Sequence, residues 1–488
     1  MVDSPGVDLE RVIAALAPVD VVNAASVVID DLEYDSRRAR PGALFVCVPG
    51  EREDGHAFAE QAVERGAVAL VVERPLSLPV PQVVVPDARR AMAELAVTFY
   101  GDPSRDLVVA GVTGTNGKTT TSFLLFAMLA AAGLRPGLIG TIESRVGGER
   151  RPAQRTTPEA VDLQRMLREM LDAGDRSCAM EATSHGSELG RLTGVRFAAL
   201  VFTNLSRDHL DFHATLHRYF AAKRRLFVEG EPAPSAVNVD DEFGRRLAEE
   251  LRLLGRAPLL TFGSSADADI RPYDLSVTPR GAAFTAAGMS VRTPLLGKFN
   301  VENVLAAAAA GRLLDLPDEA IVRGIASVRG VPGRFESVEE GQQFAVVVDY
   351  AHTPDSLANV LRTARGISTG RVICVFGCGG DRDAGKRPLM GEVASSLADL
   401  VVVTSDNPRS EDPEEIVADI IAGMSGEVEI DLDRRSAIER ALSVAREGDV
   451  VVVAGKGHEH GQEVAGETLP FDDRAVVREA LRSMGATT

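Results

Sequence analysis

The stretch Leu107-Val-Val-Ala-Gly-Val-Thr-Gly-Thr-Asn-Gly-Lys-Thr-Thr120 decides the fold. Its first six residues are mostly apolar and predict a buried strand, the glycines after them predict a tight loop, and residues 122–132 have the pattern of an amphipathic helix. In a strand-loop-helix unit of this kind, backbone N–H groups and the helix N-terminus surround phosphate oxygens. The residues that we predict to bind nucleotide phosphates are Gly114, Thr115, Asn116, Gly117, Lys118, Thr119 and Thr120.

Within this loop, Lys118 is placed to reach the β- and γ-phosphates and the Thr119 hydroxyl to bind Mg²⁺. One position departs from the general phosphate-loop pattern, because Val112 stands where the first glycine is expected.

Apolar, strand-like runs alternate with helical patterns from this stretch onward, which is typical of a parallel sheet covered on both faces. A second series of such runs begins after residue 333, and the first hundred residues are more mixed. We therefore predict an α/β protein of three domains: 1–106, a central P-loop ATPase-type parallel sheet at 107–333, and a Rossmann-like doubly wound domain at 334–488. Asp102-Pro103-Ser104 is interpreted as a linker.

Length and charge narrow the function classes. A chain of 488 residues suggests about three domains of ordinary size. The net charge of −18 argues against binding to nucleic acid or to an anionic membrane, so an anionic substrate needs local cations or metal.

Residues 1–9 lack the pattern of a signal peptide, and the apolar run 304–314 is too short to span a bilayer. Four scattered cysteines suit a reducing compartment, so we expect a cytoplasmic protein without membrane insertion, disulfides or structural zinc.

Acidic and histidine residues follow two of the predicted strands. Glu181 and His209 each come soon after an apolar run, and strand ends of a parallel sheet meet at the ligand crevice. Both are therefore expected to converge on a metal ion and the γ-phosphate. The spacing of His209, His213 and His217 also permits a zinc site. Oxygen-rich Mg²⁺ coordination is the chemistry expected after a phosphate loop, so His213 and His217 are interpreted as polar surface or substrate-side residues.

Four motifs in this order carry a family resemblance: G-T-N-G-K-T-T, M-E-x-x-S-H, N-x-x-x-D-H-L-D-x-H and Y-x-x-A-K-x-x-L-F. Together they resemble the motifs of the Mur ligases, relatives of the folylpolyglutamate and cyanophycin synthetases. The resemblance implies that Lys223, in the last motif, is N-carbamylated to N6-carboxylysine. It would then bind a second Mg²⁺ beside His209 and Glu181.

The resemblance extends from residue 35 to residue 459. It implies that Asn300 and Asn303 lie on the adenine side, and that Arg334, in P-G-R-x-E, and Asp349 also bind ATP. His352 would approach the nucleotide as a catalytic residue.

The resemblance also implies a site for a UDP-sugar peptide. The residues carried over to it are Ser36, in a uridine-binding domain, and Thr156, Thr157, Ser184 and Arg191. Ala182-Thr183 and the segment before Arg191 depart from the usual family pattern.

The amino acid to be added is indicated by Asp406-Asn407-Pro408-Arg409, which resembles the diaminopimelate-specific form of the family. An arginine can bind a second carboxylate through two hydrogen bonds, and lysine-adding members lack this arginine. The positions implied to contact diaminopimelate are Arg382, Asp406, Asn407, Arg409, Gly455 and Glu459. Glu459 would suit the second ammonium.

The resemblance thus implies a monomeric ligase of peptidoglycan synthesis that uses ATP and two Mg²⁺ to join meso-diaminopimelate to UDP-MurNAc-L-Ala-D-Glu through an acyl phosphate. The implied catalytic residues are Lys118, Glu181, His209, Lys223 and His352. Two alternatives stay open: a lysine-adding, glutamate-adding or folylpolyglutamate-type ligase, and a regulatory or transport module that uses ATP as a switch.

Overall fold

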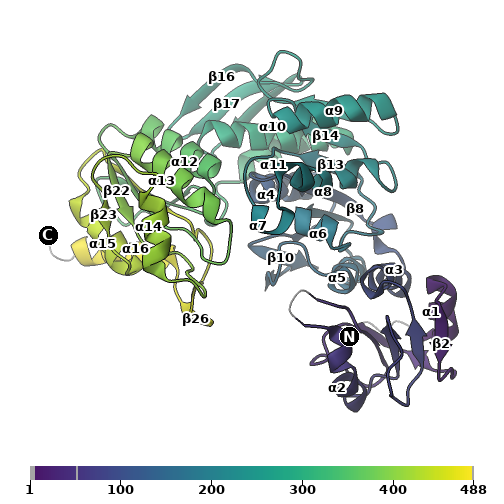
Figure 1. Ribbon diagram of the computed structural model, residues 1–488. Coiled ribbons are helices and arrows are strands. Elements are labelled where there is room, and N and C mark those ends of the chain that lie inside the picture. Colours follow the sequence, from purple (N-terminus) through teal and green to yellow (C-terminus); the bar gives the residue numbers. More distant parts are fainter. Residues whose placement is uncertain (1–5, 51–52, 486–488) are drawn as a thin grey trace. The chain divides into compact units, whose positions relative to one another are not determined.

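The structure is a computed structural model that describes residues 6–50 and 53–485 (Figure 1). The first five residues of the segment 1–9, tested above for a signal peptide, lie outside the described residues. The chain forms two compact units. Unit 1 comprises Met1–Thr113, Gly133–Leu200 and Ala222–Pro234, and unit 2 comprises Gly114–Ala132, Val201–Ala221 and Ser235–Thr488.

Unit 1 begins with a five-stranded sheet in the order β2-β7-β6-β5-β4. Its strands are Asp20–Val22 (β2), Asp31–Glu33 (β4), Ala43–Val46 (β5), Ala69–Val72 (β6) and Gln82–Val84 (β7). Neighbouring strands pair in parallel, except that β2 pairs with β7 in the antiparallel direction. Beside it lie Val7–Asp8 (β1) paired with Val28–Ile29 (β3), Leu9–Leu16 (α1), Gly55–Phe58 (η1), Ala59–Glu64 (α2) and Ala88–Tyr100 (α3).

The two faces of this sheet form separate cores because side chains alternate along a strand. Leu44 and Val46 of β5 pack with residues of α3, whereas Phe45 packs with residues of α2 on the other face. The predicted linker 102–104 overlaps Pro103–Arg105 (η2), and Ser104 is buried and accepts a hydrogen bond from Arg196 N. It is thus a packed turn rather than a free linker.

The largest sheet has the order β11-β10-β9-β12-β8-β13-β14-β15. Its strands are Val108–Thr113 (β8), Pro136–Ile139 (β9), Glu143–Val146 (β10), Glu149–Pro152 (β11), Ser177–Glu181 (β12), Ala199–Phe202 (β13), Ser235–Asn238 (β14) and Leu259–Phe262 (β15). Strands β9, β12 and β8 pair in parallel, as do β14 and β15. The parallel-sheet prediction is confirmed for these strands, but β10 and β11 add an antiparallel hairpin at one edge.

The helices between these strands are Lys118–Ala131 (α4), Ala160–Asp172 (α5), Ser184–Glu188 (α6), Leu210–His213 (α7), Leu216–Val228 (α8) and Glu242–Leu254 (α9). Lys298–Leu313 (α10) and Asp318–Ser327 (α11) follow the last strand. A three-stranded antiparallel sheet precedes α10, formed by Tyr273–Thr278 (β16), Gly281–Ala286 (β17) and Met289–Thr293 (β18).

The C-terminal sheet has the order β19-β20-β24-β21-β22-β23 and is parallel except at β19. Its strands are Glu336–Ser337 (β19), Ala345–Asp349 (β20), Val372–Phe376 (β21), Leu400–Val403 (β22), Glu429–Ile430 (β23) and Val450–Ala454 (β24). The helices are Pro354–Ile367 (α12), Ala384–Lys386 (η3), Arg387–Leu397 (α13), Pro413–Ile421 (α14), Arg434–Val444 (α15) and Asp473–Gly485 (α16). Gly461–Val464 (β25) and Glu467–Pro470 (β26) form a separate hairpin.

Both faces of the C-terminal sheet are covered. Val372, Cys374 and Phe376 pack into a core with residues of α12, α13 and α14. Ile373 and Val375 point the other way, into a core with residues of α15 and α16. The predicted doubly wound domain is therefore confirmed, and its ligand crevice is expected beyond the carboxyl ends of β20, β24, β21 and β22.

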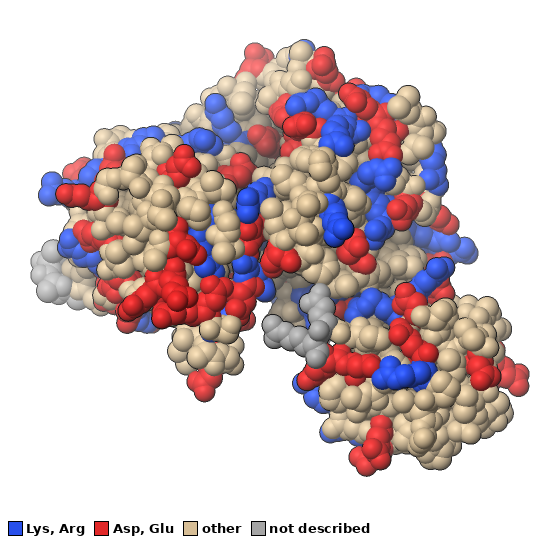
Figure 2. Space-filling model, in the orientation of Figure 1, with Lys and Arg blue, Asp and Glu red and all other residues tan. Residues whose placement is uncertain are grey.

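Acidic side chains lie on the surface (Figure 2), and the cysteine side chains lie in the interior. Figure 2 shows acidic side chains gathering over α14, whose first turn carries Glu414 and Glu415. All four cysteines are buried. Among the described residues, no helix is long and apolar enough to cross a membrane.

Candidate active site

The phosphate loop connects β8 to α4, and close approaches of backbone and side chains explain its glycines. A Cβ added to Gly114 would lie 1.9 Å from Thr203 Oγ1, and one added to Gly117 would lie 2.3 Å from Asn303 Oδ1. Both glycines have positive φ, of 147° and 88°, which larger residues rarely adopt. The Lys118 ammonium donates to the carbonyls of Gly114 and Thr115 at 3.0 and 2.8 Å. The loop is thus curled tightly around its own lysine.

The segment after β13 fixes the shape of this loop. Asn204 Oδ1 accepts a hydrogen bond from Asn116 N at 2.9 Å, and Thr115 Oγ1 donates to Ser206 O at 3.2 Å. The Asn116 side chain also donates to Asp355 Oδ2, at the start of α12, at 2.9 Å.

The predicted ATP-binding residues downstream lie in two groups. Asn300 and Asn303 are buried on α10 and bonded to each other at 2.9 Å. Arg334 Nη2 donates to Thr119 Oγ1 at 3.1 Å, and Asp349 Oδ2 accepts from Phe335 N at 2.6 Å. Unit 2 therefore brings Arg334 to the first turn of the phosphate-loop helix.

Asp208 joins two of the predicted catalytic residues, although sequence reasoning gave it no role. Its Oδ2 lies 3.3 Å from His209 Nε2 and 3.6 Å from His352 Nε2, and its Oδ1 lies 3.8 Å from Lys386 Nζ. Burial alone would raise the pKa of the Asp208 carboxyl, but these three groups hold that pKa well below its ordinary value. Asp208 is therefore an ionised anchor for both imidazoles. Its position beside His209 in the N-x-x-x-D-H motif was the available signal.

Glu181, in unit 1, is held at the end of β12 with 1% of its surface exposed. Thr141 donates to both carboxylate oxygens, from its backbone N at 2.8 Å and its Oγ1 at 3.0 Å. Thr141 Oγ1 lies 3.1 Å from Thr156 Oγ1, and Thr157 Oγ1 donates to Glu181 O at 2.8 Å. The predicted metal residue and two predicted substrate residues thus lie together. Thr141, which no sequence motif marked, connects them.

The remaining predicted residues of unit 1 are buried. Arg191 donates to Thr157 O at 3.2 Å and pairs with Glu159 at 2.8 Å, while its buried Nε has no hydrogen-bond partner among the described residues. Ser184 begins α6, and Ser36 donates to Gln61 Oε1 at 2.5 Å. Lys223, on α8, has only 1% of its surface exposed.

The predicted metal ligands are divided between the units: Thr119 and His209 belong to unit 2, and Glu181 and Lys223 to unit 1. In the part of the chain that the structure describes, no three His, Cys, Asp or Glu side chains are grouped to hold a metal ion. His213 is not a surface residue, because it is 3% exposed and its ring centroid lies 5.1 Å from that of Tyr219. The alternative, a substrate-side residue, stays a prediction.

The residues predicted to contact diaminopimelate follow β22 and β24. Asn407 Nδ2 donates to Glu459 Oε2 at 3.0 Å, and a Cβ on Gly455 would lie 2.3 Å from Asp406 Oδ2. That buried Asp406 oxygen has no hydrogen-bond partner among the described residues. Five of the six predicted diaminopimelate-binding residues thus lie in the segments that follow β22 and β24. Arg382 is exposed and donates to the neighbouring Asp381 O at 3.0 Å.

Arg409 is already bound within the protein. Its Nε lies 2.7 Å from Glu463 Oε2 on β25, and its Nη1 donates to Gly380 O at 2.7 Å. Its φ of 55° places it in the left-handed region. The guanidinium is therefore oriented before any ligand binds.

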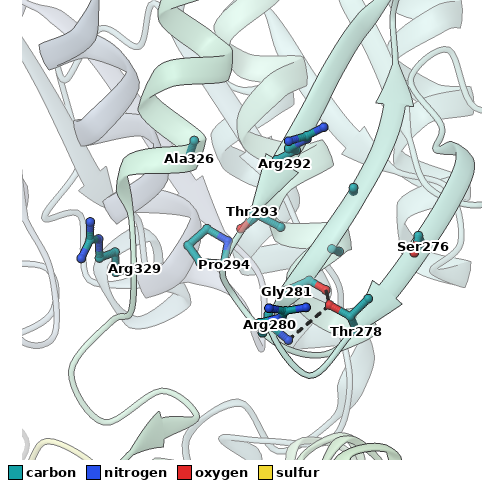
Figure 3. Close-up of a pocket in the computed structure, with 11 residues that line it drawn as sticks. Ser276, Thr278, Arg280, Gly281, Arg292, Thr293, Pro294, Ala326 and Arg329 are labelled. Carbon is teal, nitrogen blue, oxygen red and sulfur yellow. Dashed lines mark hydrogen bonds between the residues drawn. The ribbon is translucent and has the colours of Figure 1, made fainter.

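A pocket of ≈ 470 Å³ at the end of the β16-β17-β18 sheet contains none of these residues. Its lining includes Arg280, Arg292 and Arg329, and Figure 3 shows Arg292 and Arg329 on separate elements with their side chains pointing apart. The three arginines thus do not converge on one point.

Three family models match the chain: the Mur ligase family catalytic domain over residues 28–100, the Mur ligase middle domain over 112–311, and the Mur ligase glutamate ligase domain over 333–457.

Curated relatives match nearly the whole chain. The UDP-N-acetylmuramoyl-L-alanyl-D-glutamate--2,6-diaminopimelate ligase of Solibacter usitatus is 48% identical over 470 residues, covering 94% of both proteins. The ligase of the same name from Geobacillus thermodenitrificans is 48% identical over 465 residues, covering 92% of this chain and 94% of the relative.

Solved structures match as well. One described as a 2,6-diaminopimelate ligase of the same name is 35% identical, with a TM-score of 0.69, and covers 98% of this chain and 99% of the other. The Thermotoga maritima MurF ligase in complex with ADP is 21% identical, with a TM-score of 0.64 over 93% of this chain and 96% of the other, and shows a shared fold.

Proposed function

The chain belongs to the Mur ligase family, and we propose that it joins meso-diaminopimelate to the D-glutamate of UDP-MurNAc-L-Ala-D-Glu at the expense of ATP. The observation that carries this proposal is the oriented set formed by Arg409, Asn407 and Glu459 beyond β22 and β24. It offers a cation for a carboxylate and an anion for an ammonium, the two charges at the distal end of diaminopimelate. The names of the relatives agree with this substrate.

In the proposed reaction, the γ-carboxylate of D-glutamate attacks the γ-phosphorus of ATP, and ADP leaves. The amine of diaminopimelate then attacks the acyl carbon of the resulting acyl phosphate, and phosphate leaves. Lys118 and the N-terminus of α4 bind the phosphates, because Gly114 and Gly117, with their positive φ, let the loop turn into the start of the helix.

Two further side chains in unit 2, those of Arg334 and His352, are assigned to the same reaction. Arg334 contacts Thr119 at 3.1 Å, and the His352 ring is oriented by Tyr350 O at 2.8 Å and by Asp208. Both would stabilise negative charge that develops on the transferred phosphoryl group, so that positioning and electrostatics supply most of the rate.

Mg²⁺ fits the donors that the sequence predicted. Each Glu181 oxygen accepts one hydrogen bond from Thr141 and keeps a lone pair, and hydroxyl and carboxylate oxygens are the donors that Mg²⁺ prefers. Thr119, Glu181, His209 and a carbamylated Lys223 would hold two ions, which would neutralise phosphate charge.

We also propose that the protein acts as a cytoplasmic monomer with domain boundaries at 1–106, 107–333 and 334–488. The family-model ranges support these boundaries, since the first boundary lies in the gap between the models that end at residue 100 and begin at 112, and the third model begins at residue 333, beside the second boundary.

Phosphate release with ATP and UDP-MurNAc-L-Ala-D-Glu tests the proposed function. Diaminopimelate, lysine and glutamate are added in turn, and release is expected with diaminopimelate. Faster release with lysine or glutamate would identify a different ligase of the family. Release that no amino acid stimulates would favour an ATP-driven switch.

A further inference from the structure

Lys456 lies between two residues that the proposed function assigns to diaminopimelate. It directly follows Gly455 beyond β24, and its side chain is 0% exposed. Its ammonium donates to Asn407 Oδ1 at 2.8 Å and to Glu459 Oε2 at 3.0 Å. Because Asn407 Nδ2 also donates to Glu459 Oε2, at 3.0 Å, the three side chains form a closed triangle.

This triangle determines which polar atoms remain for a ligand. Asn407 Oδ1 accepts from both Lys456 and Glu463 N, so the orientation of the amide is fixed. Both protein hydrogen bonds to the Glu459 carboxylate end on Oε2, and the side chain is 31% exposed. Oε1 is therefore the oxygen that can accept a hydrogen bond from an incoming ammonium. Lys456 itself cannot reach a ligand, because it is fully buried.

We infer that Lys456 is a positioning residue for amino-acid selection: it holds the Glu459 carboxylate so that Oε1 accepts the distal ammonium of diaminopimelate. The inference rests on the proposed function and adds to it a residue that acts only through its neighbours.

A buried supporting partner of this kind is worth on the order of 10- to 100-fold in binding. Lys456→Met keeps the volume and removes the charge. We expect it to raise the KM for diaminopimelate by about that factor while the KM for ATP and for the UDP-sugar peptide and the kcat stay within about twofold. The preference for diaminopimelate over 2-aminopimelate, which lacks the distal amine, should fall by a similar factor.

A double-mutant cycle with Glu459→Gln separates positioning from a general effect. If Lys456 acts through Glu459, the double variant has the same KM for diaminopimelate as Glu459→Gln alone, whereas independent residues give effects that multiply. Lys456→Gln replaces Lys456→Met in the cycle if the methionine variant does not fold, and its amide donor should restore part of the preference.

Arg371→Met is the matched structural control. Arg371 pairs with Asp449 at 2.8 Å, next to the other ends of β21 and β24, so its loss should lower the melting temperature without changing amino-acid preference.

Three outcomes would overturn the inference. If the wild type is active, the inference fails when Lys456→Met keeps the wild-type preference for diaminopimelate over 2-aminopimelate. It also fails when the effects of Lys456→Met and Glu459→Gln on the KM for diaminopimelate multiply in the cycle. A wild type that shows no diaminopimelate-dependent phosphate release would overturn both the inference and the proposed function.

Discussion

The Arg409 guanidinium and the Glu463 carboxylate lie 2.7 Å apart, although one follows β22 and the other belongs to the hairpin β25-β26. Backbone hydrogen bonds join the same segments, from Arg409 N to Glu463 O at 3.0 Å and from Ala465 N to Arg409 O at 2.7 Å. A carboxylate of the protein thus already occupies one edge of the cation that we assign to the distal carboxylate of diaminopimelate.

Replacement of Arg409 should change amino-acid selection above all. A charge-assisted, two-point contact is worth about 2–4 kcal/mol, so Arg409→Ala should raise the KM for diaminopimelate roughly 30- to 1000-fold. Arg409→Lys should restore little, because an ammonium lacks the planar fork. Steady-state kinetics with each substrate varied in turn measures this. An unchanged preference for diaminopimelate over lysine would refute the assignment of Arg409.

Replacement of Glu463 should have the opposite effect on the KM for diaminopimelate. Glu463→Gln keeps the backbone contacts and removes a carboxylate that competes for Arg409. Because the Glu463 side chain is 49% exposed, the pair is weak, and the KM for diaminopimelate should fall only about two- to fivefold. A rise in that KM would contradict this prediction and mean that the orienting contact of Glu463 outweighs its competition with the substrate.

Lys118→Ala should abolish turnover and leave the fold intact. The ammonium contacts two loop carbonyls rather than an apolar core, so the melting temperature should change little. Loss of a cation at the transferred phosphoryl group should reduce kcat on the order of 100-fold or more. Phosphate release and thermal unfolding are measured on the same preparation. A folded variant with wild-type turnover would contradict the phosphate-loop assignment.

Lys223→Ala should be inactive and partly rescued by small carboxylates if Lys223 works as a carbamate. The side chain is fully buried, so short acids such as formate and acetate are the probes that fit the space it vacates. Intact-mass measurement of the wild type in bicarbonate buffer should detect the added carboxyl group. An unmodified lysine in a fully active enzyme would exclude the carbamate.

Stability should depend on pH through Glu302, on α10. Burial, with Asp240, Asp355 and Asp241 nearby, raises the pKa of its carboxyl to about 7. The folded state therefore favours the protonated form, and the contribution to stability is fully present below pH about 4.5 and lost as pH rises through 7. Glu302→Gln should match the wild type in melting temperature near pH 5 and exceed it at pH 8. An equal difference at both pH values would contradict this.

Sequence patterns predicted the parts of the molecule whose residues are close together in the chain. The phosphate loop was recognisable because a short apolar strand, glycines and a lysine occur within fourteen residues. The alternating apolar runs likewise predicted β20, β21, β22 and β24. Strand β16 was missed because all six of its residues are exposed, and β25 and β26 because their short, polar sequences lack an apolar alternation.

Contacts between distant segments could not be read from the sequence. Thr141 belongs to no motif, and only the fold brings it to Glu181. Asp208 stood inside a recognised motif and Lys456 directly after Gly455, but their partners, His352 and Asn407, lie far along the chain. A pattern identifies a residue, whereas its role depends on neighbours that the topology selects.

The pairing of Arg409 with the β25-β26 hairpin limits how this enzyme can be re-engineered. A graft of residues 404–409 from a ligase with another amino-acid preference would replace Arg409 and leave Glu463, its ion-pair partner on β25, unchanged. Exchange of the loop together with residues 461–470 would transfer both. If Arg409 selects the amino acid as proposed, substrate choice depends on two segments that have to be exchanged together.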